Sequence, residues 1–187
     1  MASELPIRLA TAADLDAFTA HVVRHVRESG VGGAPIFTPA RHLDGTEVRA
    51  SAAARWARAL DEPLWGRCFV LLDGGEIVGH AELRGGRIPA EMHRAGLGMG
   101  IERPHTGHGQ GRRLLDACLD WARRVAELEH VDLGVFAGNE PAQRLYRRAG
   151  FVDVGVRREA FRLEDGRAVD DILMTLDLRA AGRGRRG

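Results

Sequence analysis

The stretch from Gly100 to Leu115, GIERPHTGHGQGRRLL, constrains this chain more than any other. A strand-like segment, residues 95–101, precedes it, and afterwards apolar residues recur at the three- and four-residue spacings that are typical of a helix. Gly107, Gly109 and Gly111 lie between, and glycine lets a ligand approach the backbone without meeting a Cβ. The first turn of a helix leaves amide donors unpaired at its positive end, so the sequence predicts a site for a phosphate-bearing ligand.

Arg112 and Arg113 add positive charge to this helix start and would oppose the helix dipole without an anion, which also favours phosphate. A P-loop is excluded, because the chain contains no lysine. A dinucleotide-binding turn fits poorly, because the spacing is Gly-x-Gly-x-Gly and the nearest acid, Asp132, begins the next strand rather than ending it. A glycine-rich turn without a ligand is the remaining alternative.

The length of 187 residues suits one domain, which we expect over residues 1–179, followed by an Arg/Gly-rich and disordered tail, residues 180–187. The net charge of +1 implies no general affinity for nucleic acid or membranes. Cys68 and Cys118 have the pattern of small buried hydrophobes, without a disulfide framework or a metal motif. With neither a signal peptide nor a long apolar run, the expected location is the cytoplasm.

Strands and helices are expected in an order that gives an antiparallel first half and a βαβ unit in the second. A capping box, Thr11-Ala-Ala-Asp14, opens the first helix, on which His21 and His25 are expected at the surface. The pattern predicts an α+β fold with a mixed, mostly antiparallel sheet, and a doubly wound fold is excluded. The expected strands are 5–9, 68–72, 76–83, 92–101, 131–137, 151–156 and 170–178, and the helices after the first are 46–60, the one after the glycines, and 140–149.

A second constellation, GNEPAQRLYRRAGF, covers residues 138–151. Asn139 is a natural N-cap and Pro141 fits the first helical turn, where its missing N–H costs nothing. Ala142 and Tyr146 are four residues apart and therefore share one face of a short helix, which Gly150 ends. A capped helix with Tyr146 simply packed in the core is the alternative.

These two segments together resemble the GNAT superfamily of acetyltransferases. Thr106-Gly-His-Gly109-Gln-Gly111 is similar to the family's pyrophosphate loop, Arg/Gln-x-x-Gly-x-Gly/Ala, except that Thr106 replaces Arg or Gln. Residues 139–151 match every fixed position of the motif Asn-x-x-Ala-x-x-Leu-Tyr-x-x-x-Gly-Phe. The resemblance implies a three-layer α/β/α domain, whose sheet splays between the strand ending at Ile101 and the strand 131–137.

The resemblance also implies that acetyl-CoA lies in this cleft as co-substrate, with no metal. Gly98 and Gly100 would suit a bulge that opens the cleft, because glycine in a strand often marks close backbone approach. The residues that match the family's binding positions are Met99, Gly100, Ile101, Thr106, Gly107, His108, Gly109, Gln110, Gly111, Arg112, Arg113, Asn139, Ala142 and Tyr146.

The implied reaction is direct transfer of acetyl to a primary amine. Tyr146 matches the position of the acid that protonates the departing thiolate, and an N–H at Met99 would stabilise the oxyanion. The family often has a Glu or His base where this chain has Ala95 and Leu97. Candidate bases here are His93 and Glu82, with His80 or a water chain as alternatives.

We therefore expect an acetyl-CoA-dependent N-acetyltransferase acting on a small-molecule or protein amine, with a homodimer as one possible assembly and without nucleic acid or membrane partners. The competing hypothesis is a non-catalytic acyl-CoA-binding module of the same fold. Acids near the last hairpin could attract a cationic amine, but they are expected to be mainly solubilising charges: Glu159, Glu164, Asp165, Asp170 and Asp171.

Overall fold

A computed structural model describes residues 4–179, and the predicted tail, 180–187, lies outside the described residues. Its centre is a seven-stranded sheet in the order β1-β2-β3-β4-β5-β7-β6, in which only the β4–β5 pair is parallel. The strands are β1 (Ile7–Leu9), β2 (Gly66–Asp73), β3 (Glu76–Gly85), β4 (Arg94–Ile101), β5 (His130–Phe136), β6 (Val152–Arg162) and β7 (Ala168–Asp177). The α-helices are α1 (Leu15–Val26), α2 (Gly45–Trp56), α3 (Gln110–Arg124) and α4 (Glu140–Arg148), and short 3₁₀ segments are η1 (Ala12–Asp14), η2 (Pro89–Glu91) and η3 (Arg103–His105).

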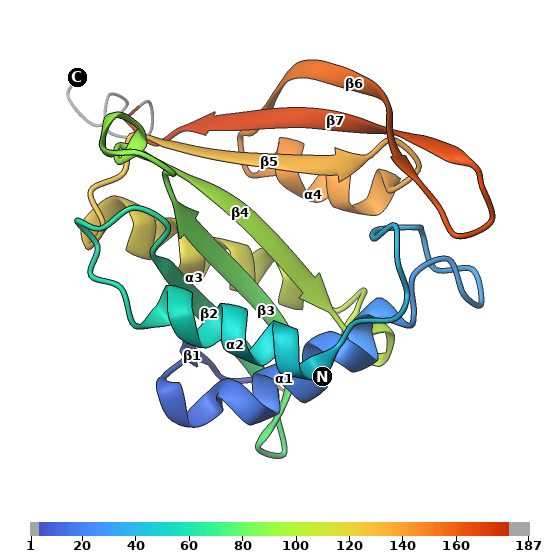
Figure 1. The fold of residues 1–187 in the computed structure, drawn as a ribbon, viewed down its shortest axis with the longest axis horizontal. Coiled ribbons are helices and arrows are strands. Elements are labelled where there is room, and N and C mark those ends of the chain that lie inside the picture. The colour runs from blue at the N-terminus through green and yellow to red at the C-terminus, as the bar shows by residue number, and fades with distance from the viewer. Residues whose placement is uncertain (1–3, 180–187) are drawn as a thin grey trace.

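The helices cover both faces of the sheet, which confirms the predicted three-layer α+β fold (Figure 1). On one face, α1 and α2 pack against β2 and β3 through a small cluster that includes Leu15, Phe18 and Val70. On the other face, α3 and α4 pack over a larger core in which Leu114 and Leu115 are fully buried. Both cysteines lie inside, as predicted, and burial raises the pKa of each thiol.

The sheet divides between β4 and β5. These strands are in register only at Arg94–His130, Ala95–Val131 and Gly96–Asp132, although β4 continues to Ile101 and β5 to Phe136. Figure 1 shows the two strands diverging from that end. The predicted splay is therefore present. It does not need the predicted bulge at Gly98 and Gly100, because the β3–β4 register runs without a shift from Gly79–Ile101 to Gly85–Ala95.

Turn chemistry fixes several element ends as the sequence predicts. Gly74 and Gly75 have positive φ in the β2–β3 hairpin, and Asp14 accepts a hydrogen bond from the Thr11 backbone N–H at 2.8 Å. Gly150 has φ +100° after α4, where the Phe151 N–H donates to the Tyr146 carbonyl at 3.1 Å in a Schellman arrangement. The predicted strand 151–156 is too short, because cross-strand pairing with β7 extends β6 to Arg162.

The prediction of surface histidines on α1 is wrong. His21 is fully buried, and His25 is only 8% exposed. The spacing of four residues does put both rings on one face, but that face packs on the sheet, where polar partners from β3 and the end of β4 satisfy His21. None of the helices in residues 4–179 is long and apolar enough to cross a membrane.

Candidate active site

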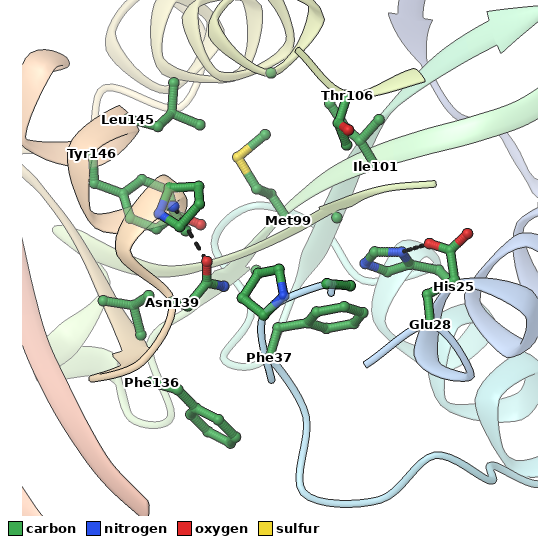
Figure 2. A pocket seen from close by; sticks show the side chains of 18 of the residues that line it. His25, Glu28, Phe37, Met99, Ile101, Thr106, Phe136, Asn139, Leu145 and Tyr146 are labelled. Atoms are coloured by element: carbon green, nitrogen blue, oxygen red, sulfur yellow. Dashed lines mark hydrogen bonds and ion pairs between the residues drawn. The ribbon is translucent and has the colours of Figure 1, made fainter. Parts of the chain in front are cut away.

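A cavity of about 750 Å³ opens where β4 and β5 part, and residues from both sides of the sheet line it (Figure 2). Its lining includes nine of the predicted binding residues, namely Met99, Gly100, Ile101, Thr106, Gly107, Gly111, Asn139, Ala142 and Tyr146. His108, Gly109, Gln110, Arg112 and Arg113 lie next to these in sequence but outside the lining. The structure thus brings the two sequence motifs together at one cleft.

The edge of β4 offers free backbone groups to this cleft. The Glu102 N–H donates to the Val78 carbonyl at 2.9 Å, so the alternating pattern of an antiparallel pair turns Met99 and Ile101 away from β3. Their N–H and C=O groups point toward β5, which has already diverged. An extended amide-bearing chain, such as a pantetheine arm, fits these groups as an added strand.

The glycine turn is shaped for a close approach to the start of α3. Gly107 and Gly109 have φ of +82° and +76°, and no heavy atom lies within 4 Å of a Cβ built on either. The amides of Gln110 and Gly111 have no backbone acceptor within residues 4–179. This combination of open space and unpaired donors at a helix N-terminus suits a pyrophosphate.

The two arginines of this turn are engaged with protein groups. Arg112 pairs with Asp116 at 2.8 Å and donates to the Arg148 carbonyl at 3.0 Å. Arg113 donates to the Leu5 carbonyl at 3.1 Å. Arg113 also lies 3.6 Å from the Glu4 carboxylate, so each arginine has an acidic partner and neither requires a bound anion.

Helix α4 presents Tyr146 to the cavity. Asn139 caps the helix by accepting a hydrogen bond from the Ala142 N–H at 3.3 Å, and Pro141 occupies the first turn. Tyr146 packs beside Phe151 with ring centroids 5.7 Å apart. Burial raises the pKa of Tyr146 to about 12, so the phenol keeps its proton at neutral pH. Burial alone shifts this pKa, and no hydrogen bond within residues 4–179 involves the hydroxyl, so the group is available to a ligand in the cavity.

The structure does not bring the two predicted bases to the cavity. His93 precedes β4 at the end where β4 and β5 are still paired, and its carbonyl accepts from the Glu129 N–H at 2.8 Å. Glu82 is 1% exposed beneath α2, where Arg55, Arg84 and Trp56 donate to its carboxylate. Burial acts to raise the pKa of Glu82, but Arg84 and Arg55 outweigh it and hold the pKa below its ordinary value. Neither side chain lines the cavity, and the role of either residue as the base stays a prediction.

Further residues, none of them among the predicted catalytic or cofactor-binding groups, line the other side of the cavity. They come from α1, from the loop after it and from the β6–β7 hairpin, and include His25, Glu28, Phe37, Phe136, Arg157, Phe161 and Asp171. Asp171 is 2% exposed, accepts from Arg157 and lies over Gly134, where a Cβ would be 2.6 Å from its Oδ2. Asp171 is therefore part of the cavity wall rather than a solubilising charge, whereas Asp170 pairs with Arg158 and Asp165 with Arg167.

Three histidines from α1 and β3 pack together behind this wall. His21 Nδ1 lies 2.7 Å from Glu102 Oε1, and His21 Nε2 lies 2.9 Å from His80 Nδ1. Burial lowers the pKa of His21 to about 3 and that of His80 well below its ordinary value, so both rings are neutral at neutral pH. Of the three rings, only His25 lines the cavity. No cluster of three or more His, Cys, Asp or Glu side chains in the described part of the chain is arranged to hold a metal ion.

Comparison with known sequences gives a family match over the same region. The sequence profile of the Acetyltransferase (GNAT) family matches residues 37–151, more than half of the chain. The matched range includes β4, the glycine turn and α4.

Two curated proteins are similar in sequence. The N-alpha-acetyltransferase RimI of Mycobacterium tuberculosis is 40% identical over 94 residues, which cover 48% of this chain and 54% of the relative. The match thus spans only about half the length of that relative. The L-amino acid N-acetyltransferase AaaT of Escherichia coli is 26% identical over 121 residues, which cover 63% of this chain and 71% of the relative.

A solved structure supports the fold. The putative acetyltransferase yncA of Salmonella typhimurium, determined with its cofactor acetyl-CoA, superposes with a TM-score of 0.77 at 24% identity. The superposition covers 94% of this chain and 95% of that one. At this identity the likeness concerns the fold.

Proposed function

This chain belongs to the GNAT family of acetyltransferases, and from that premise we propose that it transfers the acetyl group of acetyl-CoA directly to a primary amine of a small molecule or protein. The observation that carries the proposal is the arrangement of three features around one cavity. The unpaired edge of β4, the open glycine turn at the start of α3, and the protonated Tyr146 on α4 all border it.

The residues present fit acetyl-CoA, which supplies an activated acetyl group as its thioester. Backbone groups of Met99 and Ile101 would hold the pantetheine arm, and the turn from Thr106 to Gly111 would hold the pyrophosphate. Thr106, which replaces the family's Arg or Gln, uses its hydroxyl to donate to the Arg103 carbonyl at 2.8 Å. The pyrophosphate would therefore rely mainly on backbone amides.

Two groups of the chain serve the acyl transfer. The Met99 N–H, turned toward the cleft, would donate to the carbonyl oxygen as negative charge develops on it. The Tyr146 hydroxyl would donate its proton to the thiolate sulfur as the C–S bond breaks. Both residues line the cavity.

The acceptor would enter from the face that carries α1 and the β6–β7 hairpin. Three phenylalanines, Phe37, Phe136 and Phe161, give this side an apolar surface, and the buried Asp171 places one carboxylate in it. Asp171 is paired with Arg157, so the two charges largely balance, and an amine attached to a partly apolar body suits this side. The names of RimI and AaaT describe acetylation of an α-amino group and of L-amino acids, which makes α-amines the first acceptors to test.

The test is CoA release from acetyl-CoA with a panel of L-amino acids, an alanine-starting peptide and monoamines, followed by mass spectrometry of the acceptors. We expect at least one acceptor to gain the mass of one acetyl group as thiol appears. If the protein binds acetyl-CoA but no amine is modified, the non-catalytic acyl-CoA-binding module is correct instead.

A further inference from the structure

His25 is positioned against the strand that would hold the thioester. It lies on α1, lines the cavity, and stacks on Phe37 with ring centroids 4.4 Å apart. A Cβ at Gly100 would overlap its Nε2, so the glycine lets the ring sit directly on β4. Figure 2 shows the His25 ring between Glu28 and Met99, with Phe37 beside it. The side chain therefore occupies the acceptor side of the cavity next to the residue expected to bind the thioester.

Glu28 fixes the orientation of this ring. Glu28 Oε2 lies 3.3 Å from His25 Nδ1, and the Arg103 N–H donates to both carboxylate oxygens at 3.0 and 3.2 Å. A histidine whose Nδ1–H donates to a carboxylate keeps Nε2 free to accept a proton. That free nitrogen is the one beside β4.

We propose that His25 is the catalytic base that takes a proton from the acceptor amine, with Glu28 as the residue that positions it. The proposal deepens the acetyltransferase function proposed above and rests on it. It gives the proton acceptor a place on α1, rather than on β3 or β4 where sequence reasoning looked.

The charges around His25 leave it neutral and able to accept a proton. The titratable or charged groups near it are His21, Arg24 and Glu28 from α1 and its end, His80 from β3, and Glu102 and Arg103 after β4. Burial lowers the pKa of His25, while Glu28 and Glu102 offset part of that shift. His21 bonds to both His80 and Glu102, and neither His21 nor His80 lines the cavity, so His25 alone of the three can exchange its proton with the cavity.

Two protons leave the nitrogen of an ammonium acceptor when it becomes an amide. In the proposed step, His25 Nε2 removes the first, and the nitrogen lone pair forms the C–N bond to the acetyl carbon while the C–S bond breaks. The second ends on the CoA sulfur through the Tyr146 hydroxyl, which is restored. The His25 imidazolium then releases the Nε2 proton to solvent through the open cavity, which restores the Nδ1–H tautomer held by Glu28.

The decisive variant is His25→Asn, measured with the best acceptor of the amine panel. We expect kcat/KM at pH 7 to fall about 10²–10⁴-fold, the usual contribution of a general base, while the Kd for acetyl-CoA changes less than about twofold. The activity that remains should rise about tenfold per pH unit, because it depends on amine already deprotonated in solution. His42→Gln, on an exposed residue of the loop after α1, is the matched control and should keep full activity.

Glu28→Gln separates positioning from packing. The amide can still accept from Nδ1 and from Arg103 but lacks the charge, so the pKa of His25 should fall further. We expect a loss of about tenfold and a shift of the acidic limb of the kcat/KM profile to lower pH. Nitrogen-15 NMR of labelled histidines gives a readout without turnover: in the wild type the His25 signal should be the neutral Nδ1–H tautomer at pH 7.

The outcomes distinguish a failure of the proposed function from a failure of the assignment of His25. If the wild type acetylates no amine, the proposed function fails and His25 loses its role with it. If the wild type acetylates an amine and His25→Asn retains activity within about threefold, or the ring is charged or in the other tautomer at pH 7, only the assignment of His25 is overturned. Should His25→Asn not fold, Glu28→Gln and the NMR titration decide by the same criteria.

Discussion

On the α3–α4 side of the sheet, two short stretches of sequence line the cavity, residues 97–111 and 139–146. On the α1 side, the lining comes from residues 25–37, 134–136 and 157–171, segments that only the folded sheet brings together. The first side presents the unpaired backbone edge of β4 and mainly apolar side chains, and the second presents aromatic and charged side chains. The half that we propose binds CoA, called the CoA half, is thus encoded in short local stretches, whereas the proposed acceptor half depends on single side chains from distant segments.

The largest expected effect tests the chemistry of the CoA half. Tyr146→Phe keeps the ring that packs on Phe151 and removes only the hydroxyl. The kcat should fall about 10²–10⁴-fold, equivalent to roughly 3–5 kcal/mol, with little change in the KM for acetyl-CoA. The loss should shrink at high pH, where the thiolate leaves unaided. A variant with full kcat at pH 7, when chemistry limits the rate, would show that Tyr146 is a packing residue.

The same residue can be measured in the resting protein. Tyr146 is the only tyrosine of the chain, so the ultraviolet absorption of phenolate reports on it alone. The titration should give a pKa of about 12, as burial raises it. A midpoint near 10, the value of an exposed phenol, would contradict the buried position.

The second prediction concerns the contact between the two halves at Gly100. In Gly100→Ala the new Cβ would overlap His25 Nε2 and approach His80 Cε1 at 3.2 Å. We expect a loss of about 1–3 kcal/mol in the free energy of unfolding, the usual cost of overpacking. Gly98→Ala is the matched control, on the same strand and face but with open space around the Cβ. Urea unfolding compares them, and equal stability of the two variants would argue against the packing of His25 on β4.

A third prediction addresses the CoA half through Gly111. This residue lines the cavity, lacks a positive φ, and would place a Cβ at ordinary distances of 3.5 and 3.6 Å from Leu145 and Ile101. Gly111→Val should therefore fold but direct its extra methyl groups into the phosphate site, and we expect the Kd for CoA to rise about tenfold. Gly155→Val on β6, with free space at its Cβ, is the control. Unchanged CoA affinity in folded Gly111→Val would remove the pyrophosphate from this turn.

The smallest expected effect concerns the acceptor half and its buried histidines. Burial lowers the pKa of His21 in the folded protein to about 3, whereas a histidine of the unfolded chain has a pKa of about 6.5. As the pH falls below about 6.5, His21 is therefore protonated in the unfolded chain but not in the folded protein. Stability should therefore drop between pH 7 and 5.5 by about 1 kcal/mol for this residue, with His80 acting in the same direction. Urea unfolding at the two pH values measures it, and His21→Asn should flatten the dependence. A stability that stays level or rises on acidification would contradict neutral burial.

Sequence reasoning reached the CoA half because its signals are local. Glycines at 107, 109 and 150 specify positive φ, and Asn139 and Pro141 specify a helix start, so each feature follows from neighbouring residues. The acceptor half has no such signal. His25 and Glu28 look like polar residues at the end of an amphipathic helix, and only the packing of α1 on β4 brings His25 to the cavity.

The two predicted bases illustrate the same limit. Glu82 lies on β3 and His93 directly before β4, and the position along a strand decides whether a side chain reaches the cleft. His93 is at the end where β4 is still paired with β5, and Glu82 is covered by α2. The buried position of Asp171 could not be predicted either. In the sequence, an acid of this hairpin that pairs with Arg157 inside a cavity looks the same as one at the surface.

Because β4 and β5 share only three register pairs, the sheet consists of two parts, here called panels, that are joined at one end. Strands β1 to β4 form one panel and β5 to β7 the other, each hydrogen-bonded within itself. A bound pantetheine that supplies the missing amides along the open length would act as a replaceable eighth strand, so the co-substrate is also a removable part of the protein's own architecture. Without bound pantetheine, the backbone amides of the two panels should exchange hydrogen more independently of each other than in the protein with acetyl-CoA bound. The sheet would then be most flexible when CoA leaves and the next acetyl-CoA enters.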